Sequence, residues 1–334
     1  MKLLGIETSC DETGVALVED GAVLDARVAT QEIHARWGGV VPEIASRLHQ
    51  KTLSRMVGEI LADNRWTCAG LDGVAATRGP GLIGALLVGV SFAKGLAVAR
   101  DIPYVGVNHL EGHLWAAEGA GRMVPMPALA LLVSGGHTEL FRVDGFGRYT
   151  FLGGTLDDAA GEAFDKVGGL LGLPYPAGAE LSRLAEGGDG GKYTFPVARG
   201  TDAFSFSFSG LKTAVLRQVE ALKREGAAGW EADIAASFEE AAVTQLVLRL
   251  ERALEKDRYR SVMISGGVAA NRLLRRRVET ACRNREVELV VPPVQWCTDN
   301  GAMIAWVGWR SLLERGGDPL TLEADPNLTL AGEE

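Results

Sequence analysis

The sequence of 334 residues predicts an α/β protein built from two similar halves. Apolar runs with strand-like and helix-like spacing alternate along most of the chain. The length suffices for two domains of about 150 residues each. The segments LLGIETSCDETGVALVEDG and LALLVSGGHTELFRVDG, about 125 residues apart, both read as strand, polar turn and strand. This self-similarity predicts a duplicated fold.

The first half opens with a predicted β-hairpin, whose strands cover Lys2–Ile6 and Gly14–Val18 around the polar turn Glu7–Thr13. Two more strands are expected at Asp72–Thr77 and Pro103–Val107. Helices are expected at Ile44–Leu61, at Leu82–Ala99 and around His109 and His113. The run Met123–Pro127 then breaks the pattern, so we place the domain junction there.

The second half is expected to repeat this plan. Its opening strands are predicted at Ala128–Val133 and Glu139–Val143, joined by the turn Ser134–Thr138. Helices are expected over 157–171, 210–224 and 234–254, with a loop over 187–201. The strands Ser261–Ile264 and Glu288–Val291 enclose the turn 265–271 and a helix, and a last helix covers Asn300–Leu313. The segment from Gly316, rich in Pro, Asp and Glu, is expected to be poorly ordered.

Composition and charge favour a soluble cytoplasmic protein with no membrane segment. The longest apolar run, Gly81–Ala93, is too short to span a bilayer, and no secretory leader is apparent. The four cysteines form no C-x-x-C pair, so neither a disulfide framework nor a cysteine zinc site is indicated. The net charge is −9, yet residues 258–285 carry eight arginines against Glu279 alone. This stretch is either a solvated helix face or a surface that binds phosphate.

His109 and His113 form a candidate metal motif. They are four residues apart on a predicted helix, so their imidazoles project from one face. A buried structural pair is the alternative, because a metal site needs a third ligand, for which Asp299 is the best candidate. Two histidines and one carboxylate suit iron(II), and zinc is possible. The acid in His-Leu-Glu-Gly-His stands at the third place, so H-E-x-x-H protease chemistry is not supported.

Three predicted strand ends lead into turns rich in glycine and hydroxyl residues: Thr8–Gly14, Ser134–Thr138 and Ser265–Asn271. Backbone N–H groups of such turns can hold an anion. Together the three turns predict a nucleotide cleft. Asp158, Glu162 and Asp165 share a predicted helix face, which is either solvated or turned toward ribose hydroxyls.

Several segments, in order from residue 3 to about 306, together resemble the TsaD (Gcp/YgjD) family. They are GIETSCDETG, GGVVPEIASRLHQ, TRGPGLIGALLVG, NHLEGH, LVSGGHTEL, AFDKVGGLLGLPYPAG, FSFSGLKTA, SGGVAANR and CTDNGAMIA. The resemblance implies an actin, sugar-kinase and Hsp70-like (ASKHA) fold with two RNase H-like lobes around a nucleotide cleft. The parts it implies are lobes at 1–125 and 126–298, a helix at 299–315 packing back on the first lobe, and a tail at 316–334.

The resemblance also implies a reaction and its partners. The family transfers a threonylcarbamoyl group from threonylcarbamoyl-AMP to N6 of adenosine 37 in tRNAs reading ANN codons, and AMP is released. TsaB-like and TsaE-like proteins are the implied partners, with a TsaC-like synthase as the source of the adenylate. An ATPase or kinase of the same fold is the alternative, followed by a metalloendopeptidase, which the absence of H-E-x-x-H disfavours.

Site residues follow from the resemblance position by position. His109, His113 and Asp299 match the ligands of one divalent metal ion, and Asp11 and Glu12 lie in the loop where a catalytic acid is expected. The implied substrate contacts are Leu132, Val133, Ser134, Gly135, Gly136, Asp165, Gly178 and Asn271. Ala177 stands where the family often has glycine. Among the clustered arginines, Arg272, Arg275 and Arg276 are candidates for contact with tRNA.

Overall fold

The computed structural model describes residues 1–198 and 203–330. They form two compact units, one of Met1–Met123 with residues 292–330 and one of residues 124–198 with 203–291. Part of the expected loop 187–201 and the end of the tail lie outside the described residues. Residues 292–298, expected with the second half, belong to the first unit. Trp296 packs there against Gly119, and the chain then runs directly into the last helix.

The first unit is built on a mixed sheet of five strands in the order β3-β2-β1-β4-β5. The strands are β1 (Lys2–Glu7), β2 (Glu12–Glu19), β3 (Ala22–Thr30), β4 (Gly73–Gly79) and β5 (Tyr104–Asn108). β1 is central, because Leu4 pairs with Leu17 of antiparallel β2 and with Val74 of parallel β4. Every residue of β1 after Lys2 is buried, as expected for a strand covered on both faces.

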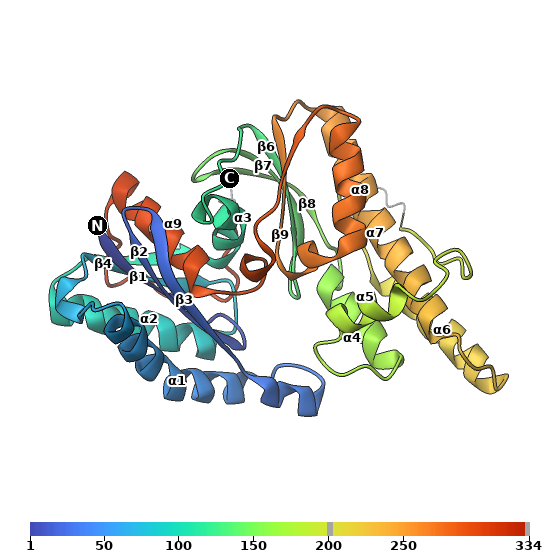
Figure 1. The fold of residues 1–334 in the computed structure, drawn as a ribbon, viewed down its shortest axis with the longest axis horizontal. Coiled ribbons are helices and arrows are strands. Elements are labelled where there is room, and N and C mark those ends of the chain that lie inside the picture. Colours follow the sequence, from blue (N-terminus) through green and yellow to red (C-terminus); the bar gives the residue numbers. More distant parts are fainter. Residues whose placement is uncertain (199–202, 331–334) are drawn as a thin grey trace. The chain divides into compact units, whose positions relative to one another are not determined.

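Helices cover both faces of this sheet (Figure 1). They are α1 (Pro42–Asp63), α2 (Ile83–Arg100), α3 (His109–Gly119) and α9 (Gly301–Arg315), with short 3-10 helices η1 (Glu32–Trp37), η2 (Cys68–Gly70) and η4 (Val294–Trp296). α1 packs on β2 and α2 on β4, while α9 packs on β1, β2 and β4 from the other side. α3 in turn packs on α9. This contact brings residues near 109 beside residues near 300.

Glycines allow α9 to approach the sheet closely. A Cβ atom on Gly5 would lie 2.4 Å from the backbone nitrogen of Ala305, and one on Gly301 would lie 2.6 Å from the carbonyl carbon of Val15. Real Cβ atoms do not come this near to backbone, so glycine is required at both positions. Because Asp299 stands two residues before Gly301, the same packing sets where Asp299 lies.

We expect Gly301→Ala to destabilise the first unit. The added methyl must push α9 away from β2, and overpacking of this kind costs about 1–3 kcal/mol. Gly58→Ala on α1 is the matched control, because a Cβ there meets nothing within 4 Å. Alanine in an exposed helix is favoured over glycine by about 0.5–1 kcal/mol. Thermal unfolding checks this, and equal melting temperatures for the two variants would contradict the packing argument.

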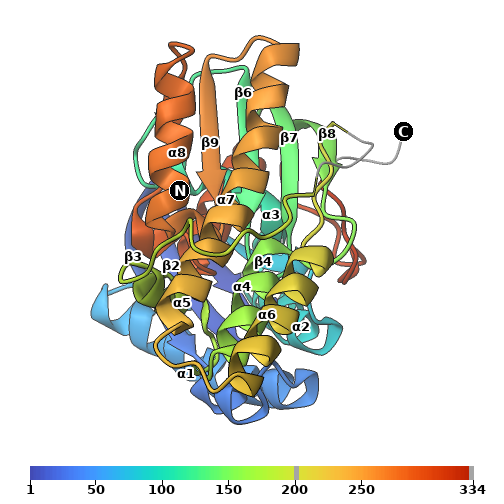
Figure 2. The ribbon, with the colours of Figure 1, turned by 90° about the vertical axis from the view of Figure 1, so that its right-hand side faces the viewer.

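The second unit repeats the sheet plan, in the order β10-β9-β6-β7-β8. Figure 2 shows β9, β6, β7 and β8 side by side. Its strands are β6 (Ala128–Val133), β7 (Thr138–Gly145), β8 (Arg148–Gly154), β9 (Ser261–Ser265) and β10 (Glu288–Val290). The central strand is β6, where Leu131 pairs with Leu140 of antiparallel β7 and with Ile264 of parallel β9. Read from the other edge, the order β8-β7-β6-β9-β10 corresponds strand by strand to β3-β2-β1-β4-β5 of the first sheet. The duplicated plan predicted from the two opening segments is therefore confirmed.

Helices of the second unit surround this sheet and its strand ends. They are α4 (Ala160–Leu170), α5 (Gly178–Ala185), α6 (Ser209–Arg224), α7 (Glu231–Lys256), the 3-10 helix η3 (Gly267–Ala270) and α8 (Arg272–Arg283). α7 packs on α5, α8 and β6 (Figure 2). The short α5 was not expected from the sequence. Its start is set by Asp165, which accepts from the backbone N–H groups of Ala177 and Gly178.

Two segments of the first unit differ from expectation. Poor order was expected from Gly316 onward, but the described residues pack on the sheet, where Asp318 donates its N–H to the carbonyl of Tyr104 at 2.7 Å and Asp325 to that of Arg78 at 2.7 Å. Pro, Asp and Glu disfavour helix and strand, but they do not prevent these backbone hydrogen bonds. The second segment is α2. The apolar run Gly81–Ala93 is too short to span a bilayer, but the whole of α2 is long and apolar enough to cross a membrane by length and composition. Its buried residues pack on α1 and β4.

Candidate metal centre

Two histidines of α3 face the same point in the first unit. α3 starts directly after β5, because Asn108 ends the strand and its Oδ1 accepts the backbone N–H of Leu110 at 2.8 Å. His109 is the first helical residue, and His113 follows one turn later on the same face. Both imidazoles are buried, with ring centroids 4.7 Å apart.

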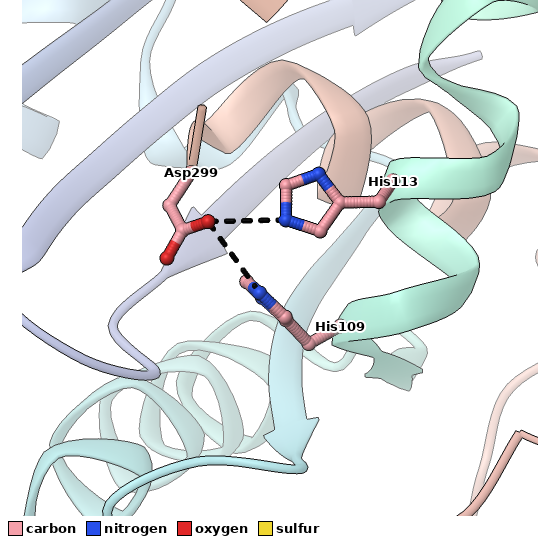
Figure 3. Close-up of side chains that lie close together, drawn as sticks. All are labelled: His109, His113 and Asp299. Atoms are coloured by element: carbon pink, nitrogen blue, oxygen red, sulfur yellow. Dashed lines mark hydrogen bonds and ion pairs between the residues drawn. The ribbon is translucent and has the colours of Figure 1, made fainter. Parts of the chain in front are cut away.

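Asp299 reaches these imidazoles from the start of α9. Asn300 caps α9 by accepting the N–H of Met303 at 2.9 Å, and Asp299 directly precedes it. Its Oδ1 lies 3.1 Å from Nε2 of His113 and 3.5 Å from Nε2 of His109 (Figure 3). One ligand atom from each residue fits within 4.8 Å of the others. Two imidazole nitrogens and a carboxylate oxygen form a donor set suited to a divalent transition metal.

Glu7 orients His109 from behind. It ends β1, is fully buried, and its Oε2 lies 3.0 Å from Nδ1 of His109. Thr77 of β4 donates to the same oxygen at 2.6 Å, and the Ser9 N–H donates to the other carboxylate oxygen. With Nδ1–H directed at Glu7, Nε2 of His109 faces Asp299, and its lone pair becomes available to a metal ion once this nitrogen loses its proton. A carboxylate behind a histidine in this way is typical of metal ligands.

The charges around this triad favour a cation. Burial acts to lower the pKa of His109, but the carboxylates of Asp299 and Glu7 outweigh it and raise that pKa to about 9. Burial acts in turn to raise the pKa of Glu7, and the attraction of His109 outweighs it and lowers that pKa. Among the described residues, the buried Nδ1 of His113 has no hydrogen-bond partner, so this ring makes its polar contact through Nε2. By donor set and by charge, the residues fit a divalent metal ion.

Asp11, in the loop between β1 and β2, and Glu12, the first residue of β2, lie in the same unit as the triad. Burial, together with the charges of Asp299 and Asp11, raises the pKa of Glu12 to about 9. This shift favours the protonated form of the carboxyl group. Burial and Asp11 also hold the pKa of the Cys10 thiol well above its usual range, so this cysteine is a poor nucleophile.

The glycine turn predicted at Ser134–Gly136 follows β6 in the second unit, directly after Leu132 and Val133. Ser134 holds the turn, since its N–H donates to the carbonyl of His137 at 2.8 Å and its Oγ accepts from the His137 N–H at 3.1 Å. Cβ atoms added to Gly135 or Gly136 would meet nothing within 4 Å. Space is therefore open on the Cβ side of both glycines, although α4 approaches Gly135 closely, since a Cβ on Gly161 would lie 2.9 Å from the Gly135 nitrogen. Such a turn can still offer backbone N–H groups to an anion.

The remaining predicted ligand contacts of the second unit gather around α5. Asp165 Oδ1 accepts from the N–H groups of Ala177 at 2.8 Å and Gly178 at 3.0 Å. Asn271 caps α8 and donates its amide to Ser182 Oγ of α5 at 2.9 Å. The methyl of Ala177 is buried over Gly168, where an added Cβ would lie 2.3 Å away. Because Gly168 has no side chain, there is room for the methyl group of Ala177, which stands where the family often has glycine.

The predicted tRNA contacts lie on α8. Arg272 pairs with Glu186 at 2.7 Å, Arg275 donates to the carbonyl of Ala269, and Arg276 is exposed. Three of their neighbours are also ion-paired: Arg277 with Glu240, Arg283 with Glu279, and Arg285 with Glu251 and Glu255. The excess of positive charge counted along the sequence is therefore partly offset by acids from other elements.

Several residues that shape these sites were not predicted from the sequence. Glu7 holds His109, Thr77 in turn holds Glu7, and Glu239 of α7 accepts the amide of Asn271 at 2.6 Å. An acid at the end of an apolar strand was a usable signal for Glu7, since such an acid is buried only with a partner. Glu239 carries no such signal, because acids are common on helix surfaces.

Comparisons with known proteins point in one direction. A family model described as TsaD, tRNA N6-adenosine threonylcarbamoyltransferase, matches residues 22–306. A curated protein of that name from Geobacter sulfurreducens is 52% identical, covering 99% of this chain and 97% of its own length. One of the same name from Dictyoglomus turgidum is 47% identical, covering 99% of both chains.

Solved structures resemble the chain in fold alone. HypF from T. kodakarensis superposes with a TM-score of 0.62 at 13% identity, covering 94% of this chain and 48% of that one. Component A of the Acidaminococcus fermentans (R)-2-hydroxyglutaryl-CoA dehydratase superposes with a TM-score of 0.57 at 14% identity, covering 94% and 100%. With the two matching sheets, these likenesses confirm the actin, sugar-kinase and Hsp70-like fold class.

Proposed function

Because the chain belongs to the TsaD family of tRNA N6-adenosine threonylcarbamoyltransferases, we propose that His109, His113 and Asp299 hold one divalent metal ion at its transfer site. The enzyme acts on tRNA and forms threonylcarbamoyladenosine. The convergence of two Nε2 atoms and one carboxylate oxygen carries the metal proposal. This donor set favours iron(II), with zinc as the second choice.

The proposed donor is threonylcarbamoyl-AMP, and the acceptor is N6 of adenosine 37 in tRNAs reading ANN codons. N6 forms a bond to the carbamoyl carbon, the bond from that carbon to the phosphate oxygen breaks, and AMP leaves with the electron pair. The mixed anhydride is already activated, so the protein has to orient the amine, stabilise the developing oxyanion and accept one proton. A bound divalent metal ion would supply Lewis-acid polarisation of an oxygen of the acyl donor.

Asp11 is the proposed acceptor of the N6 proton. An adenine amine is a poor nucleophile, so removal of its proton as the bond forms lowers the barrier. Glu12, with its raised pKa, is suited to donate a hydrogen bond to an oxygen. Glu7 keeps the His109 ring turned so that Nε2 faces Asp299.

In the second unit, we assign the adenylate to the turns and to α5. Backbone N–H groups of Gly135 and Gly136, in the turn that Leu132, Val133 and Ser134 lead into, and of Ser265–Gly267 suit a phosphate group. The amide nitrogen of Asn271 donates to Ser182 and Glu239. A ribose hydroxyl would therefore donate its hydrogen bond to the side-chain oxygen of Asn271. Asp165 fixes the N-terminus of α5 by accepting the N–H of Gly178, so it also sets the position of the Gly178 backbone, which no side chain covers.

Arg272, Arg275 and Arg276 are the proposed phosphate contacts for the tRNA. We expect charge reversal of Arg275 and Arg276 to weaken tRNA binding and to lower the salt dependence of log K by about one for each lost contact. Arg100→Glu at the exposed end of α2 is the control. Binding titrations at several salt concentrations check this, and an unchanged slope in the double variant would remove α8 from the tRNA surface.

TsaB-like and TsaE-like proteins are the partners we propose, and a TsaC-like synthase is the proposed source of the adenylate. These assignments rest on membership of the family. The net charge of −9 supports them, because the tRNA then needs positive surface from other subunits. A cytoplasmic location is part of the same proposal.

The test of this function is transfer of labelled threonine from preformed threonylcarbamoyl-AMP to unmodified tRNA. It is run with and without the partner proteins, and with His109→Ala as the control. Label on adenosine 37 that is lost in the variant supports a metal-dependent transfer. ATP hydrolysis without label under any condition would instead favour an ATPase of the same fold.

A further inference from the structure

Another buried histidine of the first unit, His49 of α1, faces the loop that carries Asp11. Its ring is fully buried. Its Nε2 lies 2.9 Å from the carbonyl oxygen of Cys10, and its Nδ1 lies 2.8 Å from Oγ1 of Thr13. The two contacts bracket Asp11 and Glu12 in the sequence, although His49 belongs to a helix packed beneath the sheet.

The chemistry of these contacts determines the state of the ring. A carbonyl oxygen only accepts, so Nε2 carries the hydrogen and donates it to Cys10. Nδ1 then has a lone pair and accepts the hydroxyl hydrogen of Thr13. Burial lowers the pKa of His49 and so keeps the ring neutral. Any rotation of the ring would break both hydrogen bonds in a place that water does not reach.

A second contact holds the other side of Asp11. The backbone N–H of Gln31 donates to the carbonyl of Asp11 at 3.2 Å. The buried side chain of Gln31 is itself fixed, since its Oε1 lies 2.9 Å from Nε2 of His34 and its amide donates to the carbonyl of Ala45 at 3.2 Å. The peptide groups before and after the Asp11 Cα atom are therefore each hydrogen-bonded to a different element.

We propose that His49 is a positioning residue for Asp11. Peptide groups are planar, so a hydrogen bond to the Cys10 carbonyl orients the plane that leads into Asp11, and Gln31 orients the plane that leaves it. With both planes held, the direction of the Asp11 Cα–Cβ bond is set. This inference rests on the proposed role of Asp11 as proton acceptor. It also gives a function to GGVVPEIASRLHQ, the segment that ends at His49 and Gln50.

Two amide substitutions of nearly equal chemistry test the proposal. His49→Gln places a side-chain N–H near the position of Nε2 and keeps the donor to Cys10. His49→Asn is one methylene shorter and does not reach that carbonyl. We expect His49→Asn to lower the single-turnover rate constant by about 10- to 100-fold, with KM for donor and tRNA changed by less than about twofold. His49→Gln is expected to stay within about threefold of wild type.

Leu53→Ala is the control for lost stability, because Leu53 is buried one turn further along the same face of α1. It should lower the melting temperature while the rate per folded molecule stays near wild type. Equal rates for His49→Gln and His49→Asn, or a loss confined to KM, would overturn the positioning role.

Hydrogen exchange of a peptide covering residues 8–13 tests the positioning role of His49 separately from the proposed role of Asp11 as proton acceptor. Faster exchange is expected in His49→Asn and not in His49→Gln. Unchanged exchange in His49→Asn would overturn the role of His49 and leave the role of Asp11 standing. Full transfer by Asp11→Asn would overturn the proton acceptor, and then the exchange result decides whether His49 orders the loop. If both proposals hold, adding His49→Asn to Asp11→Asn lowers the rate no further.

Discussion

Asp299→Asn is expected to release the metal ion and to lower transfer to tRNA by about a thousandfold or more. The amide keeps the size of the carboxylate but loses the charge that faces Nε2 of His113 at 3.1 Å and of His109 at 3.5 Å. The fold is expected to persist, because Asn300 and not Asp299 caps α9. Metal content per chain, thermal unfolding and single-turnover transfer measure the three parts of this prediction.

Asp101→Asn is the matched control for this substitution. Asp101 is exposed at the end of α2 in the same unit, and its loss of charge should affect neither metal content nor transfer. Glu7→Gln should give an intermediate result, with metal affinity lowered about 10- to 100-fold, because it loosens His109 without removing a ligand. A variant Asp299→Asn that retained one equivalent of metal and the normal rate would place the metal ion elsewhere.

Asp11→Asn is expected to lower the single-turnover rate by about a hundred- to ten-thousandfold, the usual contribution of a proton acceptor. Asparagine keeps the shape of the side chain but cannot accept the proton that N6 must lose. Binding of donor and tRNA should stay near wild type, since the loop backbone is held by His49 and Gln31. The measurement is a single-turnover assay at saturating enzyme with direct binding of both substrates.

The same change at the exposed Asp63 of α1 is the control for Asp11→Asn and should leave the rate unchanged. Glu12→Gln separates the two acids of the loop. A normal rate in Asp11→Asn with a strong loss in Glu12→Gln would move the proton acceptor to Glu12. A loss in Asp11→Asn that appeared only as weaker binding would make Asp11 a substrate contact.

The periodicity of apolar residues predicted much of the fold. The strand expected at Ala128–Val133 has those bounds in the structure, and the one expected at Lys2–Ile6 extends by one residue to Glu7. Alternation of such segments led to the α/β class, and the two matching openings led to two sheets of the same order. Periodicity failed where order depends on a distant partner, as in α5 and in the described part of the segment after Gly316.

The sequence also indicated one half of the metal centre. Spacing alone places His109 and His113 on one helix face, because successive turns of a helix stack residues four apart. Asp299 follows from local pattern only as the best candidate for a third ligand, and the family resemblance supports it, although it lies 186 positions from His113 along the chain. No local pattern predicts such a pair, since its distance depends on how α9 packs against α3 and the sheet.

The sequence by itself therefore determined the class of fold, the duplication, the histidine pair and the family. The tertiary structure alone decided how these groups lie and what supports them: the distances from Asp299 to both histidines, Glu7 behind His109, and His49 and Gln31 on either side of Asp11. The physical reason is one of range. Periodicity and capping act over a few residues, whereas burial and hydrogen bonding of a polar group depend on every element that packs around it.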